Sequence, residues 1–391
     1  MKNYLAVNTG SASKKYALYD ESDQELWRTH FEKEGKVFIV NFQASDRSEK
    51  IEIKKKDFDN AIAFLLARRP ALRSFSEGEA DSLAVAGVRV VAPGEYFSSN
   101  RSIDERFLKK LEAAVEQAPL HITPALTEIK QLRKIFPDLP MIAVSDSAFS
   151  AEMPDHSRLY SLPESIAAKL GIYRYGYHGI SLRSIVGKVE KLLGRMPSRV
   201  VICHLGSGST VAAVRDGKCF DTSMGFTPLE GIPMGTRIGN IDAGAVIYLA
   251  KKSRLSLEKL EDFFNKECGL LGLSGKTADV RELLELEEKS DKKSARALEI
   301  FVYHIKKYIG AYAAAMGGLD LLVFTATIGE RSFIIRRRVC TGLENLGVAL
   351  DEIKNNATVS VDGFIGTANS SAKVAVIPTD EMGEIYRSII R

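Results

Sequence analysis

Short apolar runs separated by glycine-rich and polar turns recur along the chain and predict alternating strands and helices. The first two runs, residues 4–7 and 16–19, flank the small-residue turn Asn8-Thr9-Gly10-Ser11-Ala12-Ser13 and predict a β-hairpin. Other periodicities predict further elements, namely strands over residues 82–91 and 141–144 and helices over residues 57–68 and 103–117. Strands that alternate with helices favour mixed α/β domains.

The most apolar stretch, residues 309–328, contains a single charge, Asp320. Apolar residues at spacings of three and four predict a long helix over residues 294–316 that leads into this stretch. Gly317-Gly318 would end the helix, and residues 321–324 have the pattern of a buried strand. We therefore predict a helix, a turn and a strand here rather than a membrane span.

The hairpin pattern returns at residues 200–221, VVICHLGSGSTVAAVRDGKCFD, where Gly206 takes the place of Gly10. Asp216-Gly217 then supplies a hairpin turn into a third strand. Another glycine turn, in residues 321–332, also follows a predicted strand. Two copies of strand, turn and strand indicate duplicated α/β halves whose turns offer backbone amides to an anion. A chance match is the alternative, because Gly-Ser turns are common.

Composition and charge limit the class of protein. The 391 residues are 45% hydrophobic and 27% charged, which is enough for a sizeable core in two or three domains of about 150 residues each. The net charge of +4, from 54 basic and 50 acidic residues, does not indicate a nucleic-acid binder or a polybasic membrane binder. The four cysteines form no CxxC pair and the first apolar run ends at Val7, so we expect a cytoplasmic protein without a signal peptide or a zinc site.

Several charged or imidazole side chains lie at predicted strand ends or in turns, where clefts form. Arg89 lies in the apolar run LAVAGVRVVAPGE and needs a ligand or a structural salt bridge, since an unpaired buried charge is costly. Asp146 follows a predicted strand, and strand ends are where α/β domains bind ligands. His121, between prolines in APLHITP, is either a site residue or a structural histidine.

Two further segments concentrate the candidate chemistry. His178 follows an aromatic cluster in YRYGYHGIS and precedes Gly179, so its ring should face an open cleft. Residues 221–242, DTSMGFTPLEGIPMGTRIGNID, surround Arg237 with glycines and predict a long functional loop. Arginines, histidines, an aspartate and glycine turns together indicate chemistry on a phosphorylated compound, because phosphoryl transfer needs cations around the charged oxygens. The sequence contains neither GxxxxGK[ST] nor the protein-kinase signature HRDxxxxN, which excludes those two classes.

Six motifs, in order along nearly the whole chain, resemble the acetate and propionate kinase family: VNTGSASKKYALYD, APLHITP, YRYGYHGIS, HLGSGSTVAAVRDGKCFDTSMGFTPLEGIPMGTRIGNID, FTATIGER and VIPTDE. The long central motif is highly specific to that family, which belongs to the sugar kinase, Hsc70 and actin superfamily. The resemblance implies an α/β fold of two duplicated ribonuclease H-like (actin-like ATPase) domains with a nucleotide cleft between them. The expected domains are residues 1–145, completed by a C-terminal helix 383–391, and residues 146–382, with the nucleotide site and a dimer interface.

The resemblance also implies a reaction, the reversible transfer of a phosphoryl group from ATP to the carboxylate of acetate, giving acetyl phosphate and ADP. It implies Mg²⁺ or Mn²⁺, a cytoplasmic homodimer, and neither a nucleic-acid nor a membrane partner. Arg89 and Arg237 would hold the acyl carboxylate and the transferring phosphoryl group, and His178 would hydrogen-bond that group. His121 would support the transition state, and Asp146 would orient Arg237 or the substrate.

The site residues that the resemblance implies fall into four groups. The catalytic group is Arg89, His121, Asp146, His178 and Arg237. The acyl group would contact Arg89, Val91, Leu120, Tyr177 and Pro228, and the metal would be placed by Asn8 and Glu381. The nucleotide and its phosphates would contact Ser11, Ser13, Lys15, His204, Gly206, Ser207, Gly208, Asp279, Val280, Arg281, Thr327, Ile328, Gly329, Glu330 and Arg331.

The sequence departs from the family's pattern mainly on the nucleotide side. Ser207 and Arg331 stand at asparagine positions, and Thr327 stands at a glycine position. A Cβ at residue 327 narrows the approach to the backbone, so we expect altered donor selectivity, toward another purine triphosphate or a shorter phosphate donor. Tyr177 stands at a phenylalanine position and adds a hydroxyl beside the acyl pocket. Lys14, where the family is usually apolar, is interpreted as a solvated charge with an open role.

Three alternatives stay open. A propionate or other short-chain acyl kinase differs from an acetate kinase by one methylene in an apolar pocket, which is worth only about 1–3 kcal/mol. A non-catalytic, actin-like nucleotide-binding protein would have no use for the polar set described above. A sugar kinase would need a general base for its hydroxyl nucleophile, and the central motif does not resemble one.

Overall fold

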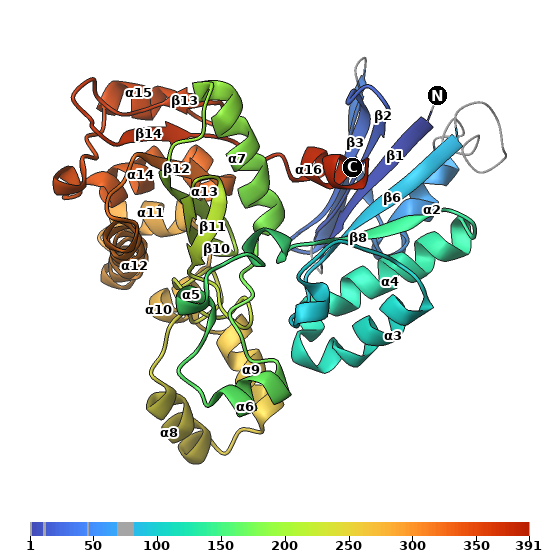
Figure 1. Cartoon of the computed structure of the whole chain (residues 1–391), viewed down its shortest axis with the longest axis horizontal. Helices are drawn as coiled ribbons and strands as arrows, with labels where there is room; N and C mark the ends of the chain where they lie inside the picture. The colour runs from blue at the N-terminus through green and yellow to red at the C-terminus, as the bar shows by residue number, and fades with distance from the viewer. Residues whose placement is uncertain (1, 11–12, 45–46, 69–81, 391) are drawn as a thin grey trace. The chain divides into compact units, whose positions relative to one another are not determined.

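The computed structural model describes residues 2–10, 13–44, 47–68 and 82–390. Its contacts divide the chain into two compact units (Figure 1): unit 1 is Met1–Ala148 together with Asp380–Arg391, and unit 2 is Phe149–Thr379. Unit 1 thus extends three residues past the predicted limit at residue 145. It also contains Asp146 and Glu381, which we had expected in the second domain.

Unit 1 is built on an eight-stranded mixed sheet in the order β5-β4-β3-β2-β1-β6-β8-β7. Its strands are β1 (Lys2–Thr9), β2 (Ser13–Asp20), β3 (Glu25–Glu34), β4 (Val37–Ala44), β5 (Arg47–Ile53), β6 (Ser82–Val90), β7 (Arg101–Ser102) and β8 (Met141–Ser145). Its helices are α1 (Lys55–Asp59), α2 (Ala61–Arg68), α3 (Glu105–Ala113), α4 (Pro119–Ile135) and α16 (Glu381–Ile389).

Unit 2 is built on a six-stranded sheet in the order β11-β10-β9-β12-β14-β13. Its strands are β9 (Arg199–Leu205), β10 (Ser209–Arg215), β11 (Lys218–Thr222), β12 (Leu321–Thr325), β13 (Gly363–Phe364) and β14 (Lys373–Val376). Its helices are α5 (Asp155–Arg158), α6 (Glu164–Leu170), α7 (Gly179–Leu193), α8 (Ala243–Ser253), α9 (Leu257–Lys266), α10 (Gly269–Ser274), α11 (Val280–Glu288), α12 (Lys292–Met316), α13 (Ala326–Arg331), α14 (Phe333–Cys340) and α15 (Glu352–Ala357).

Six strands of each sheet share one topology. The order β3-β2-β1-β6-β8-β7 in unit 1 corresponds to β11-β10-β9-β12-β14-β13 in unit 2. In both, the first three strands are antiparallel, the third to fifth are parallel, and the last is antiparallel again. The predicted duplication of α/β halves is therefore confirmed, and Gly10 and Gly206 follow the equivalent strands β1 and β9.

Alternation along the strands of unit 1 sends neighbouring side chains to opposite faces of the sheet. In β6, Ala86 and Val88 belong to the apolar core that also includes residues of α1 to α4. Gly87 faces the other way, toward α16, where a Cβ would lie 2.8 Å from Ile385 and Ile389. Only glycine therefore lets α16 pack this closely on the sheet.

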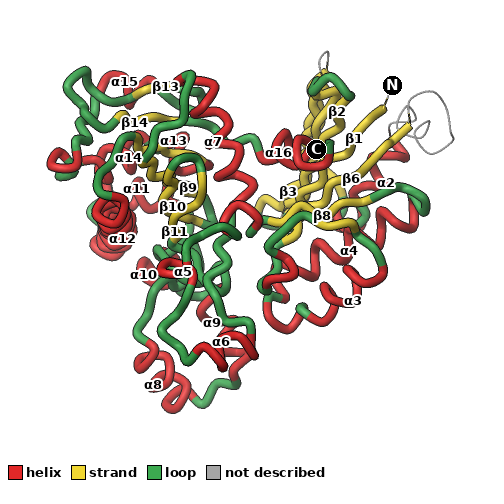
Figure 2. Tube along the Cα trace, viewed as in Figure 1, coloured by secondary structure: helices red, strands yellow, loops and turns green. Residues whose placement is uncertain are grey.

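The sheet of unit 2 is covered on both faces by the same rule (Figure 2). In β9, Val201 and Cys203 pack in a core with α12, whereas Val200 and Ile202 pack in a core with α7. His204 continues the second set and so faces α7. This alternation decides which polar side chains meet the first turn of α7.

Several predicted elements are confirmed, namely the strands at β6, β8 and β12 and the long helix at α12. The predicted helix over residues 57–68 is wrong as a single element, because it is interrupted at Asn60 between α1 and α2. The predicted helix over residues 103–117 is shorter, because α3 ends at Ala113 and a short 3₁₀ turn follows. Within the described ranges, none of the helices combines the length and the apolarity that crossing a bilayer requires.

Candidate active site

The polar residues of unit 1 meet where β1, β6 and β8 end and α16 begins. We call Asn8, Arg89, Asp146 and Glu381 the unit 1 cluster. Asn8 is the next-to-last residue of β1, Arg89 lies near the end of β6, and Asp146 directly follows β8. Glu381 is the first residue of α16, the helix that covers this face of the sheet. The carboxyl ends of parallel strands thus gather the cluster, as in other α/β ligand sites.

Hydrogen bonds join the unit 1 cluster into one chain. Arg89 donates from Nε to Asp146 Oδ1 at 3.1 Å and from Nη2 to Asp146 Oδ2 at 3.0 Å. Its Nη1 donates to Asn8 Oδ1 at 3.1 Å, and Asn8 Nδ2 donates to Glu381 Oε2 at 2.9 Å. Asp146 therefore fixes the guanidinium plane with a two-point contact, which is the geometry that makes Arg a rigid anion holder.

The charge balance of this cluster favours a permanently cationic Arg89. Burial alone would lower the pKa of Arg89, but the nearby carboxylates of Asp146 and Glu381 outweigh burial and raise the pKa of Arg89 above its ordinary value. The Asp146 carboxylate is fully buried, while the Arg89 side chain keeps 19% of its surface exposed. The Arg89 side chain thus keeps some exposed surface while Asp146 holds its guanidinium.

The two lysines of the first hairpin point to opposite faces of the sheet. Lys15 lies opposite Asn8 in the β1–β2 register, so it shares the face of the unit 1 cluster. Lys14 points into the core, where its Nζ donates to Glu128 Oε2 at 2.9 Å. The interpretation of Lys14 as a solvated charge is wrong, because its side chain is 8% exposed and that of Glu128 is fully buried.

The remaining hairpin residues are only partly described. Ser13 contacts His30 of β3, with 2.8 Å between Ser13 Oγ and His30 Nε2. Ser11, predicted to lie near the phosphates, falls outside the described residues.

The remaining predicted site residues of unit 1 lie just after β6 and on α4. Val91, directly after β6, is buried. His121 and Leu120 belong to the first turn of α4, whose first residue is Pro119. Leu120 is 37% exposed, and His121 is half-buried. The predicted acyl contacts of Val91 and Leu120, and the predicted role of His121 in supporting the transition state, remain predictions.

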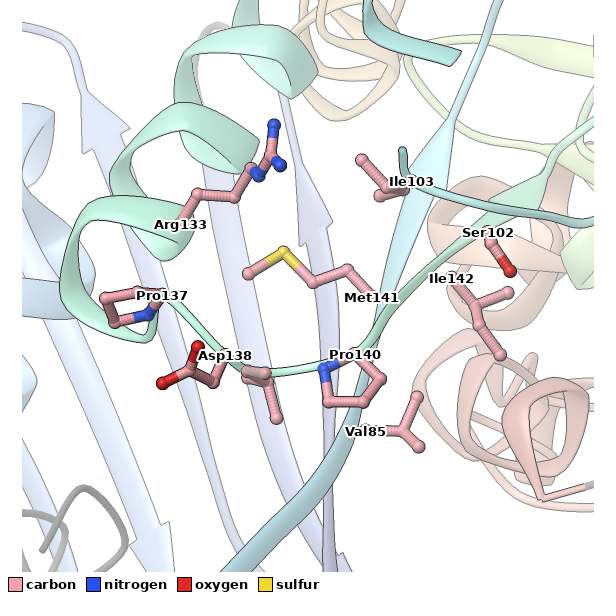
Figure 3. Close-up of a pocket in the computed structure, with 10 residues that line it drawn as sticks. Val85, Ser102, Ile103, Arg133, Pro137, Asp138, Pro140, Met141 and Ile142 are labelled. Carbon is pink, nitrogen blue, oxygen red and sulfur yellow. The ribbon is translucent and has the colours of Figure 1, made fainter. Parts of the chain in front are cut away.

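A separate cavity of about 300 Å³ lies at the other end of β8. Figure 3 shows Arg133 and Asp138 at its rim and Met141 on its wall. Met141 is the first residue of β8, whereas Asp146 follows its last residue. This cavity is therefore remote from the unit 1 cluster along the strand, and we assign it no part in the chemistry.

In unit 2 the second glycine turn brings a histidine and an arginine to one residue. A Cβ placed on Gly208 would lie 3.2 Å from His178 Nε2 and 3.4 Å from Arg237 Nη1. Arg237 comes from the long loop between β11 and α8, which Figure 2 draws without helix or strand. His178 is the N-cap residue of α7, with a left-handed φ of 60° that is uncommon outside glycine. Sequence-distant segments thus converge on the turn.

The ring of His178 stacks on His204, with centroids 4.2 Å apart and planes 21° apart. His178 Nδ1 lies 2.9 Å from Thr210 Oγ1, and His204 Nδ1 lies 2.8 Å from Ser181 Oγ. His204 and Thr210 are opposite one another in the β9–β10 register, so both face α7. Sequence reasoning missed Thr210 and Ser181, although Ser181 lies three residues after His178 in the quoted motif.

The long loop is braced by polar contacts that sequence reasoning also missed. Arg174 Nη1 donates to Glu230 Oε1 at 2.9 Å, and Glu230 also accepts a hydrogen bond from the Tyr160 hydroxyl. The Tyr160 oxygen in turn accepts from the backbone N–H of Phe226 at 2.9 Å. Tyr177 donates its hydroxyl to the Phe226 carbonyl at 2.6 Å. The extra hydroxyl of Tyr177 therefore tethers the loop, a use that the sequence did not predict.

The glycine turn of α13 carries the donor-side residues. Thr327 and Arg331 are exposed, Gly329 is buried, and Ile328 and Glu330 are half-buried. Arg331 Nε donates to Ser360 Oγ at 3.3 Å. The arginine that replaces the family's asparagine at this position therefore has a hydrogen-bond partner on the surface.

A buried arginine, Arg336, hydrogen-bonds the backbone of the glycine turn of α13. Arg336 is fully buried and donates to the carbonyl oxygens of Gly329 and Glu330, at 2.9 Å each, and to Asn355 and Thr358. Burial lowers the pKa of Arg336 to about 10. Its hydrogen bonds to carbonyls replace a counterion and satisfy the C-terminal end of α13.

The predicted adenine strip begins α11. Asp279 is the N-cap, and its Oδ1 accepts from the backbone N–H of Arg281 at 2.8 Å. Arg281 itself is exposed, whereas Val280 is buried in the core with α12. A nucleotide beside this strip would therefore meet the side chains of Asp279 and Arg281 rather than that of Val280.

The donor set of the unit 1 cluster fits a magnesium ion held mainly through water and phosphate. Mg²⁺ prefers oxygen ligands and usually keeps several waters, with one or two carboxylates and the substrate phosphates. Glu381 supplies one carboxylate, and Asn8 is hydrogen-bonded to it. No group of three or more His, Cys, Asp or Glu side chains suited to a metal occurs in the described part of the chain.

Comparison with known proteins identifies the family. The model of the Acetokinase family matches residues 3–387. The chain belongs to this family. The acetate kinase of Bacillus cytotoxicus is 39% identical over 397 residues, covering 100% of this chain and 99% of that protein. The predicted membership of the acetate and propionate kinase family is confirmed.

Solved structures of the family share the fold. The crystal structure of Porphyromonas gingivalis acetate kinase matches with a TM-score of 0.84 and 32% identity, covering 100% of this chain and 99% of that chain. A propionate kinase from Francisella tularensis matches with a TM-score of 0.88 and 34% identity, covering 99% of both chains. The predicted fold class of two duplicated α/β domains is thus supported by structure as well as by sequence.

Proposed function

We propose that this chain catalyses the reversible transfer of a phosphoryl group from ATP to the carboxylate of acetate, giving acetyl phosphate and ADP. The observation that carries the proposal is the approach of His178 and Arg237 to Gly208 in a member of the Acetokinase family. An imidazole and a guanidinium beside a glycine turn supply hydrogen-bond donors and positive charge to a phosphoryl group.

The acceptor chemistry needs little proton transfer. A carboxylate is already ionised at neutral pH and can attack phosphorus directly, so no general base is required. The barrier comes from bringing two anions together in line, and catalysis depends on neutralising their charge and fixing their positions. This requirement explains why the cationic side chains of the site are held in place by neighbouring residues.

The roles proposed for the site residues follow from this need. Arg89, held by Asp146, would bind the acyl carboxylate, and Arg237 and His178 would bind the transferring phosphoryl group. His121 would support the transition state. The acyl methyl would contact the apolar set Val91, Leu120, Tyr177 and Pro228.

The donor side is proposed to use the two glycine turns and the adenine strip. Ser13, Lys15, Gly206, Ser207 and Gly208 would lie near the phosphates. Asn8 and Glu381 would place the Mg²⁺ ion, which when bound neutralises charge on the phosphates. Thr327 and Arg331, which are exposed on α13, are proposed to alter the choice of phosphate donor.

The test is trapping of the acyl phosphate as a hydroxamate. Purified protein with Mg²⁺ is assayed with acetate, propionate and butyrate, each with ATP, GTP and pyrophosphate. We expect acetyl hydroxamate with ATP. No acyl phosphate with any combination would overturn the proposal and favour a non-catalytic nucleotide-binding protein.

The site assignment is tested by Arg237→Ala. Loss of one donor to the transferring group typically costs about 3 kcal/mol, or on the order of a hundredfold in rate. We expect the rate of turnover to fall by on the order of a hundredfold, with an unchanged circular dichroism spectrum. Arg195→Ala, at an exposed arginine outside the site, is the matched control. A near-wild-type rate for the Arg237 variant would refute the assignment.

Propionate is the second candidate substrate, because a propionate kinase is among the structures with the same fold. One methylene in an apolar pocket changes binding by only about 1–3 kcal/mol. The ratio of kcat/KM for propionate and acetate in the same assay decides between them.

We further propose that the chain forms a homodimer through unit 2. Large apolar side chains are exposed in two segments of this unit: Leu159, Leu162, Ile166 and Leu170 around α6, and Ile241, Ile247, Tyr248 and Leu257 around α8. Exposed apolar surface of this kind usually marks an interaction site. Sedimentation should give a dimer for wild type and a monomer for Tyr248→Asp. Ile353→Asp, at an 83% exposed residue of α15, should remain dimeric.

A cytoplasmic location is the remaining part of the proposal. All four cysteines are free thiols, as expected in a reducing compartment. Fractionation of the native host would test this location directly.

A further inference from the structure

A chain of hydroxyl groups leads from the last residue of unit 2 to the stacked imidazoles. Thr379 Oγ1 donates to Ser181 Oγ at 2.8 Å, and Ser181 Oγ lies 2.8 Å from His204 Nδ1. Ser181 is fully buried in the first turn of α7, the helix that begins directly after His178. Figure 1 shows α7 beside the sheet of unit 2. Neither Thr379 nor Ser181 has a role in the function proposed above.

The neighbouring donors fix the direction of this chain. Ser184 gives its hydroxyl proton to the Ser181 carbonyl at 2.8 Å, so at its 3.4 Å distance from Thr379 it can only accept. Thr379 donates to the nearer oxygen, that of Ser181, at 2.8 Å. A hydroxyl has one proton, so Ser181, accepting from Thr379, keeps its own proton available for His204 Nδ1, which lies 2.8 Å away.

The direction of the chain determines the tautomer of His204. An imidazole nitrogen that accepts a hydrogen bond carries no proton, and in the neutral ring the proton is then on the other nitrogen. With Ser181 as the donor, Nδ1 of His204 carries no proton, and the neutral ring then holds its proton on Nε2. If Nδ1 carried a proton, Ser181 would have to accept from it as well as from Thr379. The Ser181 hydroxyl proton would then have to point to another acceptor.

We propose that Thr379 and Ser181 are positioning residues that keep His204 neutral, as the Nε2–H tautomer, beside His178. The two rings are stacked with centroids 4.2 Å apart, and two imidazolium charges at that distance would repel strongly. With His204 held neutral, the charge that interacts with a phosphoryl group is free to reside on His178. This inference rests on the proposed function only for its catalytic consequence, since the tautomer is a property of the free protein.

The tautomer is measured by side-chain NMR of the full-length protein labelled with ¹⁵N-histidine. Six histidines give a small set of signals, and a His204→Gln variant assigns those of His204. We expect the Nε2–H pattern for His204 in the wild type. An Nδ1–H pattern, or a doubly protonated ring at neutral pH, would overturn the proposal.

The relay is tested by Thr379→Val, which removes the hydroxyl with little change in volume. His204 should then show a mixture of tautomers, because Ser181 can now either donate or accept. Thr379→Ser restores the hydroxyl and should restore the wild-type signals even if the valine variant folds poorly. Ser184→Ala is the matched control and should leave His204 unchanged. Unchanged His204 signals in a folded Thr379→Val variant would overturn the relay.

Activity adds a second measurement. For Thr379→Val we expect kcat to fall about tenfold, equivalent to about 1.4 kcal/mol, with KM for acetate unchanged. A purely structural role would lower stability without this split between kcat and KM. If the wild-type protein makes no acyl phosphate, the proposed function fails while the NMR result still decides the tautomer.

Discussion

The buried ion pair between Lys14 and Glu128 gives the sharpest prediction about stability. Lys14 Nζ lies 2.9 Å from Glu128 Oε2, and Tyr16 donates its hydroxyl to Glu128 Oε1 at 2.6 Å. Lys14 also donates to the Asp59 carbonyl at 3.0 Å. The pair ties β2, which also carries Lys15, to the middle of α4. We perturb it with Lys14→Met, Glu128→Leu and the double variant.

The magnitudes follow from burial. At 2.9 Å the two charges attract by about 6 kcal/mol at an effective dielectric constant of about 20, but most of this is offset by the cost of removing both ions from water. Removing one partner leaves the other charge buried and should cost about 3–5 kcal/mol. The double variant replaces both charges with apolar groups, so it should lie within about 1 kcal/mol of wild type.

The assay uses the only tryptophan of the chain, Trp27, which is buried in β3 of unit 1. Its fluorescence during urea unfolding reports unit 1 separately from unit 2. Each single variant should lower the urea midpoint, and the double variant should recover it. Tyr16→Phe, which removes one hydrogen bond from Glu128, should have a smaller effect, about 1–2 kcal/mol.

Two results would refute this reasoning. Single variants that unfold at the wild-type midpoint would mean that the charges are not desolvated in the native protein. A double variant as unstable as the singles would mean that the pair is worth more than the apolar contacts that replace it. After either result, the presence of a lysine at position 14, where the family is usually apolar, would again be unexplained.

Three further predictions concern the site and its surroundings. Gly208→Ala places a Cβ 3.2 Å from His178 Nε2 and 3.4 Å from Arg237 Nη1, so kcat should fall at least about tenfold with little change in thermal midpoint, and unchanged kcat would contradict the geometry. Thr327→Gly should lower KM for ATP and leave KM for acetate unchanged, and an unchanged KM for ATP would remove this residue from donor selection. In native protein at pH 8 only Cys268 should react with a thiol reagent. Burial raises the pKa of all four thiols, but Cys268 is only half-buried, whereas the other three are buried and out of reach of the reagent. Mass spectrometry showing a second labelled cysteine would refute this.

Local patterns were sufficient for much of the fold. The strands of both hairpins and the long helix α12 follow from apolar spacing, and the repeated turns indicated the duplication that the shared strand order confirms. Such features depend on residues close together in sequence, so they can be found without the rest of the chain. The interruption at Asn60 was missed because the apolar spacing on either side of it continues a helical pattern.

The partners of the site residues could not be predicted in this way. Arg89 was expected to need a partner, but that Asp146 holds it at two points depends on the parallel pairing of β6 and β8. The Thr379–Ser181 contact joins residues 198 positions apart, and no local spacing encodes it.

Lys14 and Lys15 of the first hairpin best separate what the sequence determines from what only the tertiary structure decides. The sequence determined that both lie on one strand beside a small-residue turn, and therefore that their side chains point to opposite faces. Only the tertiary structure decided what each face meets. On the face that meets α4, Lys14 contacts Glu128, so Lys14 is a buried structural charge. The other face carries Asn8 and the unit 1 cluster beside α16, so Lys15 lies on the face where we propose that a ligand binds. Strand geometry is local, but Glu128, which gives the Lys14 face its chemistry, lies 114 positions away in the sequence.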